Sequence, residues 1–233
     1  RWSTLMGGNQ VGISGLSRQN AISYTTPTLH GFSIQAAWGE QDAVNNGMWD
    51  IALRYAGEFS GFRVAAAISY GENAGSTSDF QDSPIANGST EAEKWQGSAS
   101  VLHVASGLYL TGAYVNQSFN VAVPDTTYWY LQGGVSRNWT GLGNTVLYGE
   151  YGRFEDGGVG VSAGGLNGLI TDSEVTFWGV GVVQHIDAAA MELYLAYRNY
   201  EAYMDTASGG VGPALDGNID SLSVVTAGAR IRF

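Results

Sequence analysis

The sequence predicts an all-β fold: an antiparallel β-barrel whose strands cross a membrane. Three observations lead to this prediction. Side chains alternate between an apolar and a polar face over long segments, these segments are long for soluble strands, and short and long connections alternate between them. Of the 233 residues 44% are hydrophobic and 13% charged, yet no stretch reaches the roughly 18 apolar residues of a membrane-spanning helix.

Alternation is clearest at residues 49–55 (WDIALRY), 62–70 (FRVAAAISY) and 191–198 (MELYLAYR). Each segment places large apolar side chains on one face and charged or small ones on the other, which is typical of a strand. In order along the chain, eleven strands are expected at 18–25, 31–40, 48–58, 61–73, 93–105, 107–119, 126–139, 143–154, 174–187, 190–204 and 218–233.

The connections between these strands alternate in length. Short turns are expected near 26–30, 59–60, 106, 140–142 and 188–189. Longer loops are expected at 41–47, 74–92, 120–125, 155–173 and 205–217. Such alternation indicates antiparallel neighbours, with tight turns at one end of the sheet and elaborate loops at the other.

The apolar face is expected to meet lipid. A soluble barrel would carry many Lys and Glu outside, whereas the polar face here holds Ser, Gln, Thr, Gly and a few charges. Strands of about 10–14 residues exceed the 5–6 typical of soluble sheets and suffice to cross a bilayer at a tilt. Trp38, Tyr70 and Tyr148, each followed by Gly-Glu, and Phe32 and Phe62 at the opposite strand ends predict two interfacial aromatic girdles.

Several segments resemble the general bacterial porins, most closely the trimeric outer-membrane porins of alphaproteobacteria. They are residues 18–32 (RQNAISYTTPTLHGF), 49–62 (WDIALRYAGEFSGF) and 179–198 (GVGVVQHIDAAAMELYLAYR). The C-terminal ARIRF, ending in Phe233, resembles the assembly signal of outer-membrane barrels. The resemblance spans about 18–233 and is specific as a set rather than in any one piece.

The resemblance implies a 16-stranded barrel in the bacterial outer membrane, surrounded by outer-membrane lipid and assembled as a homotrimer. It also implies passive diffusion of ions and small hydrophilic solutes, and a constriction loop folded into the channel. Single-chain bacterial barrels have an even number of strands, whereas eleven are expected here. Residues 1–17 are therefore expected to be the tail of the constriction loop. Residues 18–233 would be wall strands joined by short periplasmic turns and longer extracellular loops. A complete small barrel of 10 or 12 strands is the alternative.

Alternation assigns the charged residues of the strands to the channel side, because a charge facing the hydrocarbon costs roughly 2–4 kcal/mol. The expected pore-lining residues are Asp50, Arg54, Arg63, Glu150, Glu192, Arg198, Arg230 and Arg232. As a group these residues would bias the passage of ions. The alternative is that each charge merely pairs with an opposite charge on a neighbouring strand. By resemblance Arg18 faces the constriction loop, although alternation places it on the face of Ile22 and Tyr24.

No enzyme, cofactor, metal site or nucleic-acid partner is expected. The net charge of −11 disfavours nucleic acid. Cysteine is absent, His30, His103 and His185 are scattered, and Asp205, Asp216 and Asp220 match no calcium-loop spacing. The sequence thus favours a water-filled diffusion channel. The alternative is a structural or adhesive barrel with a closed lumen, acting through its external loops.

A modest cation preference is expected, weakening as salt rises. Acids gather at the loop end and outnumber the inward arginines, so the entrance would attract cations within about one Debye length, roughly 8–10 Å. These acids are Glu40, Asp42, Glu72, Asp79, Asp82, Glu91, Glu93, Glu155, Asp156, Asp172 and Asp205.

Overall fold

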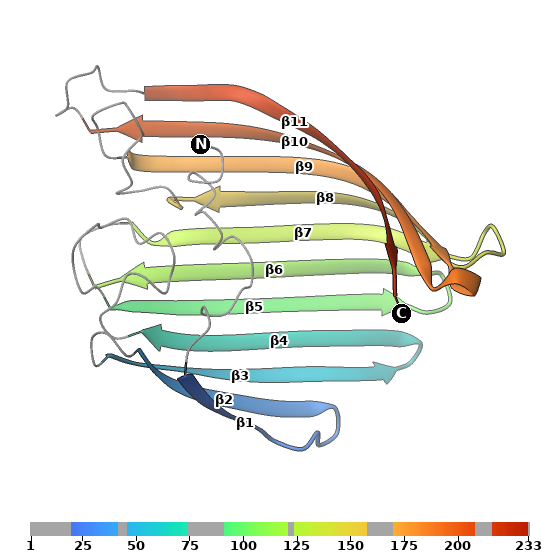
Figure 1. The fold of residues 1–233 in the computed structure, drawn as a ribbon, viewed down its shortest axis with the longest axis horizontal. Helices are drawn as coiled ribbons and strands as arrows, with labels where there is room; N and C mark the ends of the chain where they lie inside the picture. Colours follow the sequence, from blue (N-terminus) through green and yellow to red (C-terminus); the bar gives the residue numbers. More distant parts are fainter. Residues whose placement is uncertain are drawn as a thin grey trace.

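The computed structural model describes residues 20–41, 46–73, 91–120, 124–157, 170–207 and 216–232. Eleven strands form one antiparallel sheet in which every strand pairs with its neighbours in sequence (Figure 1). The strands are β1 (Asn20–Thr25), β2 (Phe32–Gln41), β3 (Asn46–Phe59), β4 (Phe62–Asn73), β5 (Ala92–His103), β6 (Leu108–Phe119), β7 (Thr126–Arg137), β8 (Thr145–Glu155), β9 (Ile170–Ile186), β10 (Met191–Thr206) and β11 (Asp216–Ile231). All eleven predicted strands are confirmed, with ends shifted by at most four residues.

The connections confirm the predicted alternation. The short ones, 26–31, 60–61, 104–107, 138–144 and 187–190, lie together at one end of the sheet (Figure 1). Ser60 and Gly61 have φ of 49° and 79°, as a type I′ hairpin turn requires. The last short connection contains the 3₁₀ turn η2 (Asp187–Ala189). We call this end of the strands the turn end and the opposite end of the strands the loop end.

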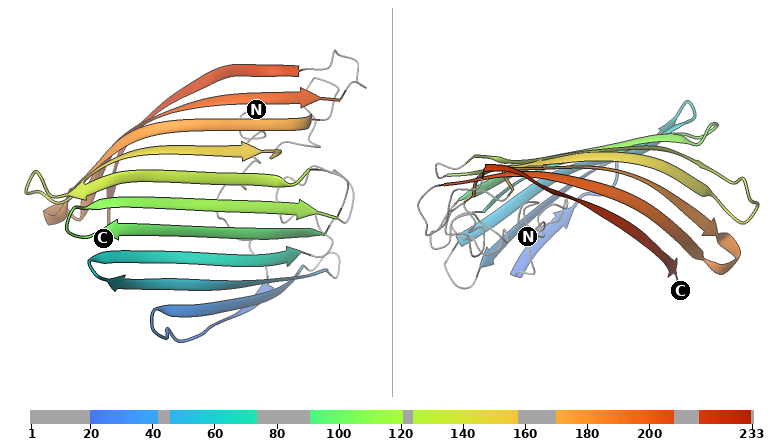
Figure 2. Two further views of the ribbon diagram at one scale, coloured as in Figure 1. Left: turned by 180° about the vertical axis from the view of Figure 1, so that it is seen from behind. Right: turned by 90° about the horizontal axis from the view of Figure 1, so that it is seen from above.

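The sheet is curved and not closed (Figure 2). In the described residues β1 pairs only with β2 and β11 only with β10, so the two edges do not meet. Strand-to-strand registers are continuous except for shifts at Tyr200/Ala202 and Asp205/Thr206. None of the described residues belongs to a helix of sufficient length and apolarity to span a bilayer.

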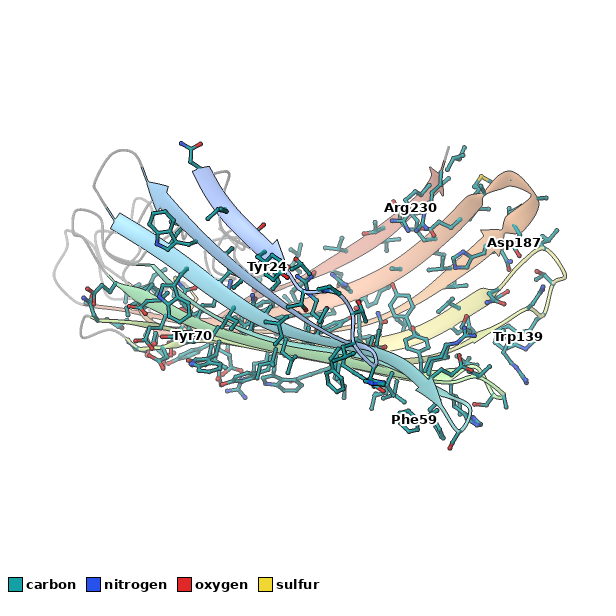
Figure 3. The ribbon with its side chains drawn as sticks, turned by 90° about the horizontal axis from the view of Figure 1, so that it is seen from below. Tyr24, Phe59, Tyr70, Trp139, Asp187 and Arg230 are labelled. Atoms are coloured by element: carbon teal, nitrogen blue, oxygen red, sulfur yellow. The ribbon has the colours of Figure 1, made fainter. Side chains whose placement is uncertain are left out.

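The register assigns each side chain to one of two faces. Arg198 on β10 reaches Glu150 on β8 across Gly179 of the intervening β9, so these residues lie on the concave face, where side chains converge. Residues directly opposite each other on paired strands share a face, which extends this assignment through the sheet. Phe59 is on the other, convex face, below the curved sheet in Figure 3.

The two faces differ in character. Exposed large apolar side chains occupy the convex face of β1–β11, among them Ile22, Ile34, Leu53, Ile68, Leu131, Val180 and Leu195. The buried apolar cluster, by contrast, lies on the concave face of β8–β10. This polarity is the reverse of a soluble barrel, whose outer surface is polar.

Candidate channel wall and membrane surface

A continuous row of aromatic rings crosses the convex face, one ring per strand, from near the loop end on β2 to the middle of β9 and β10. The ring centroids of Trp49 and Tyr70 are 5.4 Å apart, and those of Tyr70 and Trp95 are 4.6 Å apart. The row consists of Trp38, Trp49, Tyr70, Trp95, Tyr114, Trp129, Tyr151, Trp178 and Tyr197. We call it the upper girdle, because amphipathic rings prefer the headgroup level of a membrane.

The register of the upper girdle reveals the strand tilt. Tyr70 is directly opposite Trp95, but the next ring, Tyr114, is two residues off the position opposite Trp95. The same two-residue step recurs at every second strand. A step of about 6.8 Å for every two strand spacings of about 4.8 Å gives a tilt of roughly 35°, as in transmembrane barrels. A level row of rings across the sheet therefore requires tilted strands.

On the described strands, aromatic rings at the turn end of the convex face lie on β2–β5, and Trp139 lies in the connection between β7 and β8. Phe32 packs on Tyr55 with ring centroids 4.6 Å apart, and Phe62 packs on His103 at 4.8 Å. Leu108, Val135 and Leu147 take the corresponding convex positions on β6–β8. The predicted second girdle is thus present on β2–β5 and aliphatic farther along.

Tyr148 corrects one of the predicted girdle positions. It lies on the same concave face as Glu150, and Tyr151 takes the girdle position on β8. The prediction rested on the similarity of the sequence YGE at 148–150 to YGE at 70–72, but the motif at 148–150 lies near the middle of β8. The tyrosine side chains of the two motifs therefore lie on opposite faces of the sheet.

The concave face divides into two walls. The small-residue wall, on β2–β6, presents mostly small or hydroxyl side chains together with Arg54 and Arg63. Its small members are Ser33, Ala37, Ala52, Ala56, Ala65, Ala67, Ser69, Ser98, Ser100, Thr111 and Ala113. Ser100 and Thr111 hydrogen-bond to each other at 2.8 Å. A wall of short side chains leaves free space on its concave side.

The aromatic wall, on β7–β10, is packed instead of open. Tyr128 stacks on Phe154 with ring centroids 4.3 Å apart and planes 14° apart, and Phe177 contacts Tyr200 at 5.4 Å. Phe154 and Phe177 are each 5% exposed, and Val175 is fully buried. The wall comprises Tyr128, Tyr130, Tyr148, Phe154, Val175, Phe177, Tyr194, Tyr200 and Ala202.

An ion pair with a buried carboxylate lies within the aromatic wall. Arg198 donates from Nε and Nη2 to the two carboxylate oxygens of Glu150, at 2.5 and 2.9 Å. The Tyr130 hydroxyl donates to the same carboxylate at 2.7 Å, and Gln132 donates to Tyr130 at 2.9 Å. The Glu150 side chain is 0% exposed, whereas that of Arg198 is 42% exposed and lies 5.3 Å from the Phe177 ring centre.

Two more of the predicted pore-lining residues form an ion pair, and a third pairs with a residue that was not predicted. Arg230 binds Glu192 at 2.5 Å near the turn end, with His185 3.9 Å from the same carboxylate. Arg63 binds Glu58 at 2.8 Å, and both side chains are more than half exposed.

The remaining predicted residues fall into three groups. Asp50 and Arg54 share the concave face of β3, and neither forms an ion pair with another described residue. Arg232 follows β11 at the turn end, where its backbone N–H donates to Ala190 at 3.0 Å. Arg18 and Phe233 lie outside the described residues.

Sequence reasoning missed Tyr130, Gln132 and Lys94, which also occupy the concave face. Lys94, the only lysine of the chain, is buried. The signal for all three was available, because each adjoins a convex aromatic or leucine, Trp95, Trp129 or Leu131. Strict alternation from those neighbours would have assigned them correctly.

The acids near the loop end do not all lie on the concave face. The register places acids directly opposite each other on the convex face, at Glu72/Glu93, Glu155/Glu174 and Asp172/Asp205. Arg153 binds both Glu155, at 2.6 Å, and Glu174, at 3.0 Å. Burial raises the pKa of the Asp156 carboxyl above its ordinary value; a backbone hydrogen bond from Ser173 opposes this rise, and Asp172 and Glu155 add to it. Among the residues described, no three acids or histidines converge as a metal site would require.

Comparisons with known proteins agree with this architecture. A solved structure of OmpT, an outer membrane protein of Vibrio cholerae in its trimer form, is 12% identical with a TM-score of 0.50, covering 89% of this chain and 64% of that one. Its loop L8 deletion mutant is 11% identical with a TM-score of 0.46, covering 90% and 62%. The chain thus spans less than two thirds of these solved chains. No curated protein matches.

The curved sheet, its apolar convex face and the fold it shares with OmpT define a β-barrel protein of the bacterial outer membrane. Residues 1–77 match the family model of Gram-negative porins, so this part of the chain is similar to a bacterial outer-membrane porin. The alphaproteobacterial subtype stays a prediction.

Proposed function

We propose that the protein forms a water-filled channel for passive diffusion of ions and small hydrophilic solutes and carries out no catalysis. The observation that supports this most directly is the small-residue wall: short side chains and exposed Arg54 and Arg63 on the concave side of a membrane-facing sheet. A closed barrel would fill that side with bulky or networked groups.

Planar-bilayer recording of the intact protein tests the channel. Stable ohmic conductance steps are expected. A protein that inserts into the bilayer but never conducts would contradict the proposal and favour the structural or adhesive barrel with a closed lumen, acting through its loops.

We further propose a modest cation preference. On the concave face Arg63, Arg198 and Arg230 are paired with acids, so their fields largely cancel, and Asp50 offsets Arg54. The loop-end acids then decide the sign, although outward-facing Glu72 and Glu93 act on the channel mouth only within about a Debye length, roughly 8–10 Å. A reversal potential under a KCl gradient showing chloride selectivity at low salt would refute the preference.

The remaining pore-lining assignments, Glu150, Glu192, Arg18 and Arg232 included, are part of the same proposal. We also propose residues 1–17 as the tail of a constriction segment, with the loop end extracellular. Its support is the resemblance of residues 18–32 to a wall segment of the general bacterial porins, in which a constriction loop folds into the channel. Deleting residues 1–17 should raise single-channel conductance. Unchanged conductance would contradict this assignment.

Finally, we propose a homotrimer within a 16-stranded architecture. The support is the family match and the trimer form of the OmpT structure. Native mass spectrometry in detergent should give three times the monomer mass, and a spectrum containing monomer alone would refute the assembly.

A further inference from the structure

Two tyrosine rings of the concave face lie along the sheet instead of projecting from it. The ring of Tyr148 on β8 lies across Gly181 of β9, where a Cβ would overlap the tyrosine hydroxyl and lie 2.6 Å from Cε1. The ring of Tyr194 on β10 lies across Gly228 of β11, where a Cβ would lie 2.6 Å from Cζ. Because the end of each ring occupies the space of a side chain on the next strand, one face of the ring rests on the wall and the other is turned toward the lumen of the proposed channel.

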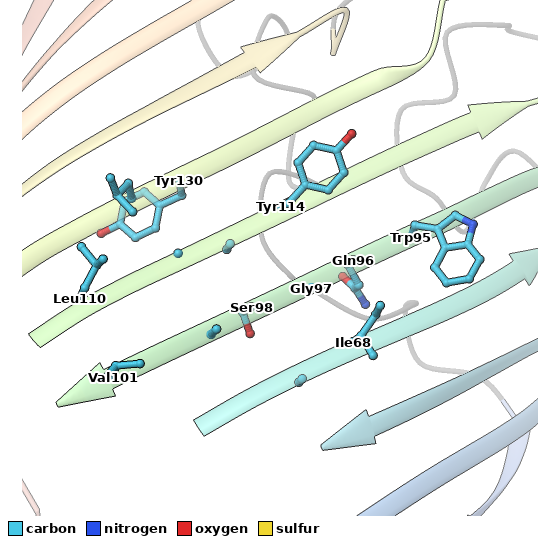
Figure 4. A pocket seen from close by; sticks show the side chains of 14 residues that line it. Ile68, Trp95, Gln96, Gly97, Ser98, Val101, Leu110, Tyr114 and Tyr130 are labelled. Carbon is cyan, nitrogen blue, oxygen red and sulfur yellow. The ribbon is translucent and has the colours of Figure 1, made fainter. Parts of the chain in front are cut away.

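Four glycines of the convex face show the contrast. Gly97 and Gly112 line an open apolar groove (Figure 4), where a Cβ would lie 3.6 and 3.7 Å from its nearest neighbours. At Gly133 and Gly149 the nearest atoms would be 3.4 and 3.9 Å away. None of these nearest atoms belongs to an aromatic ring. The two glycines of the concave face, by contrast, are covered by rings, and a side chain at either of them would force its ring to rise from the wall.

The strand tilt brings the two concave rings to one depth in the membrane. Each tyrosine is three residues toward the turn end from the upper-girdle ring of its own strand, Tyr151 on β8 and Tyr197 on β10. Two strand spacings and two residues separate the Cα atoms of Tyr148 and Tyr194, which gives a distance of roughly 12 Å. Both side chains are partly exposed. We call this pair of rings the tyrosine platform.

The hydroxyls of the tyrosine platform are available to a ligand. Neither has a hydrogen-bond partner among the described residues. Tyr109 on β6 lies across Gly134 in the same way, but its hydroxyl donates to Gln132 Oε1 at 3.2 Å. It is also five residues from Tyr114, the girdle ring of its strand, and so lies nearer the turn end. Tyr109 is therefore not part of the platform.

The charges beside the tyrosine platform are paired. Glu150, two residues toward the loop end from the platform ring of β8, is bound by Arg198. Glu192, two residues toward the turn end from the platform ring of β10, is bound by Arg230 and has His185 at 3.9 Å. Paired charges exert little net field but keep hydrogen-bonding groups at the edges of the platform. The surroundings therefore favour an uncharged ligand that is rich in hydroxyls.

We infer that the tyrosine platform binds neutral oligosaccharides of equatorially substituted pyranose rings, such as β-linked glucose. A pyranose ring of this kind presents C–H groups on its two faces and hydroxyls at its edge. The C–H faces stack on the tyrosine rings through dispersion contacts, and the edge hydroxyls bond to the tyrosine hydroxyls and the paired charges. This inference rests on the proposed function, because the channel would bring the sugar to the concave face.

Planar-bilayer recording of the intact protein with cellotriose, a short β-linked glucose oligomer, tests the site. Wild type should show interruptions of the current that become more frequent as the sugar concentration rises. They should persist at high salt, because an uncharged ligand is not screened. Sorbitol, an open-chain polyol without a flat C–H face, should produce none.

Three double variants separate the ring faces from the rest of the wall. Y148L/Y194L keeps an apolar side chain over each glycine but removes both ring faces, and it should weaken cellotriose binding about tenfold. Y148F/Y194F keeps both rings and should bind more tightly than the leucine variant. Y151L/Y197L is the matched control, because it makes the same change in the same strands on the convex face, and it should bind as wild type does. Conductance without sugar shows that each variant is folded.

Saturation-transfer NMR of the detergent-solubilised protein detects bound sugar without conduction, so it separates the platform from the channel. A protein that never conducts, but whose cellotriose signal is lost in Y148L/Y194L, would refute the channel and support the platform. Conduction without interruption by cellotriose and without saturation transfer would overturn the platform alone. Sorbitol acting as strongly as cellotriose, or equal affinity of wild type and Y148L/Y194L, would overturn it as well.

Discussion

The small-residue wall and the aromatic wall share one face of one sheet but hold charge in different ways. On the small-residue wall Arg63 and Glu58 pair with side chains 61% and 52% exposed. On the aromatic wall Arg198 and Glu150 pair at 42% and 0% exposure, with Tyr130 and Gln132 completing the network. The first pair is solvated, whereas the second is part of the packed structure.

This difference teaches that a charged residue on the concave face need not act on ions in the proposed channel. A solvated charge contributes to the electrostatic field that ions meet. A buried carboxylate bound by a guanidinium contributes little to that field and instead fixes the positions of the side chains around it. The bulk of neighbouring side chains decides which role a charge has. Rings beside Glu150 exclude water, whereas alanines and serines around Arg54 and Arg63 do not.

The largest expected effect comes from breaking the buried pair. E150A removes the acceptor of both Arg198 and Tyr130 and should destabilise the folded protein by about 3 kcal/mol. E58A, the matched change on the small-residue wall, should cost about 0.5 kcal/mol because that pair is solvated. Urea unfolding of the vesicle-inserted protein, followed by tryptophan fluorescence, measures both. Equal destabilisation by the two variants would erase the distinction between the walls.

A second comparison concerns glycines on the concave face. In the aromatic wall a Cβ at Gly134 would overlap the carbonyl oxygen of Leu147 and approach Tyr109 Cε1 at 2.9 Å, so backbone must shift. At Gly71, on the small-residue side, the nearest atom is Asp50 Cβ at 3.3 Å. G134A should therefore destabilise by about 2 kcal/mol, and G71A by less than about 0.5 kcal/mol.

The same urea titration measures both glycine variants, with unchanged slopes showing that the unfolded state is unaffected. If G134A were as mild as G71A, the aromatic wall would be loosely packed, and its low exposure would then have another origin.

The alternation of apolar and polar residues limits how much of the two walls the sequence could predict. Period two predicted the strands, the convex belt and the concave charges, because each depends only on neighbouring residues. The positions of Tyr148 and of the aromatic wall depend on which face of the sheet each aromatic side chain occupies. The residue type does not decide this, because an aromatic side chain fits either against lipid or within a packed concave face. The closeness of Glu150 and Arg198 depends further on the registers of β8, β9 and β10 together, with Gly179 between them. Composition and local spacing do not contain that information.

The smallest expected effect is on ion selectivity, and it separates the walls by function. R54Q removes an exposed charge from the small-residue wall and leaves Asp50 beside it, so the lumen becomes more negative. The potassium-to-chloride permeability ratio should rise about 1.5- to 2-fold at low salt, and less at high salt, because exposed charges are screened first.

The double variant E150Q/R198Q removes one charge of each sign from the aromatic wall and leaves two amides able to hydrogen-bond. Its permeability ratio should stay at the wild-type value, because the pair it replaces is neutral as a unit. Reversal potentials under a KCl gradient compare the two variants directly. A shift in E150Q/R198Q as large as that in R54Q would mean that Arg198, still 42% exposed, acts on passing ions despite its partner.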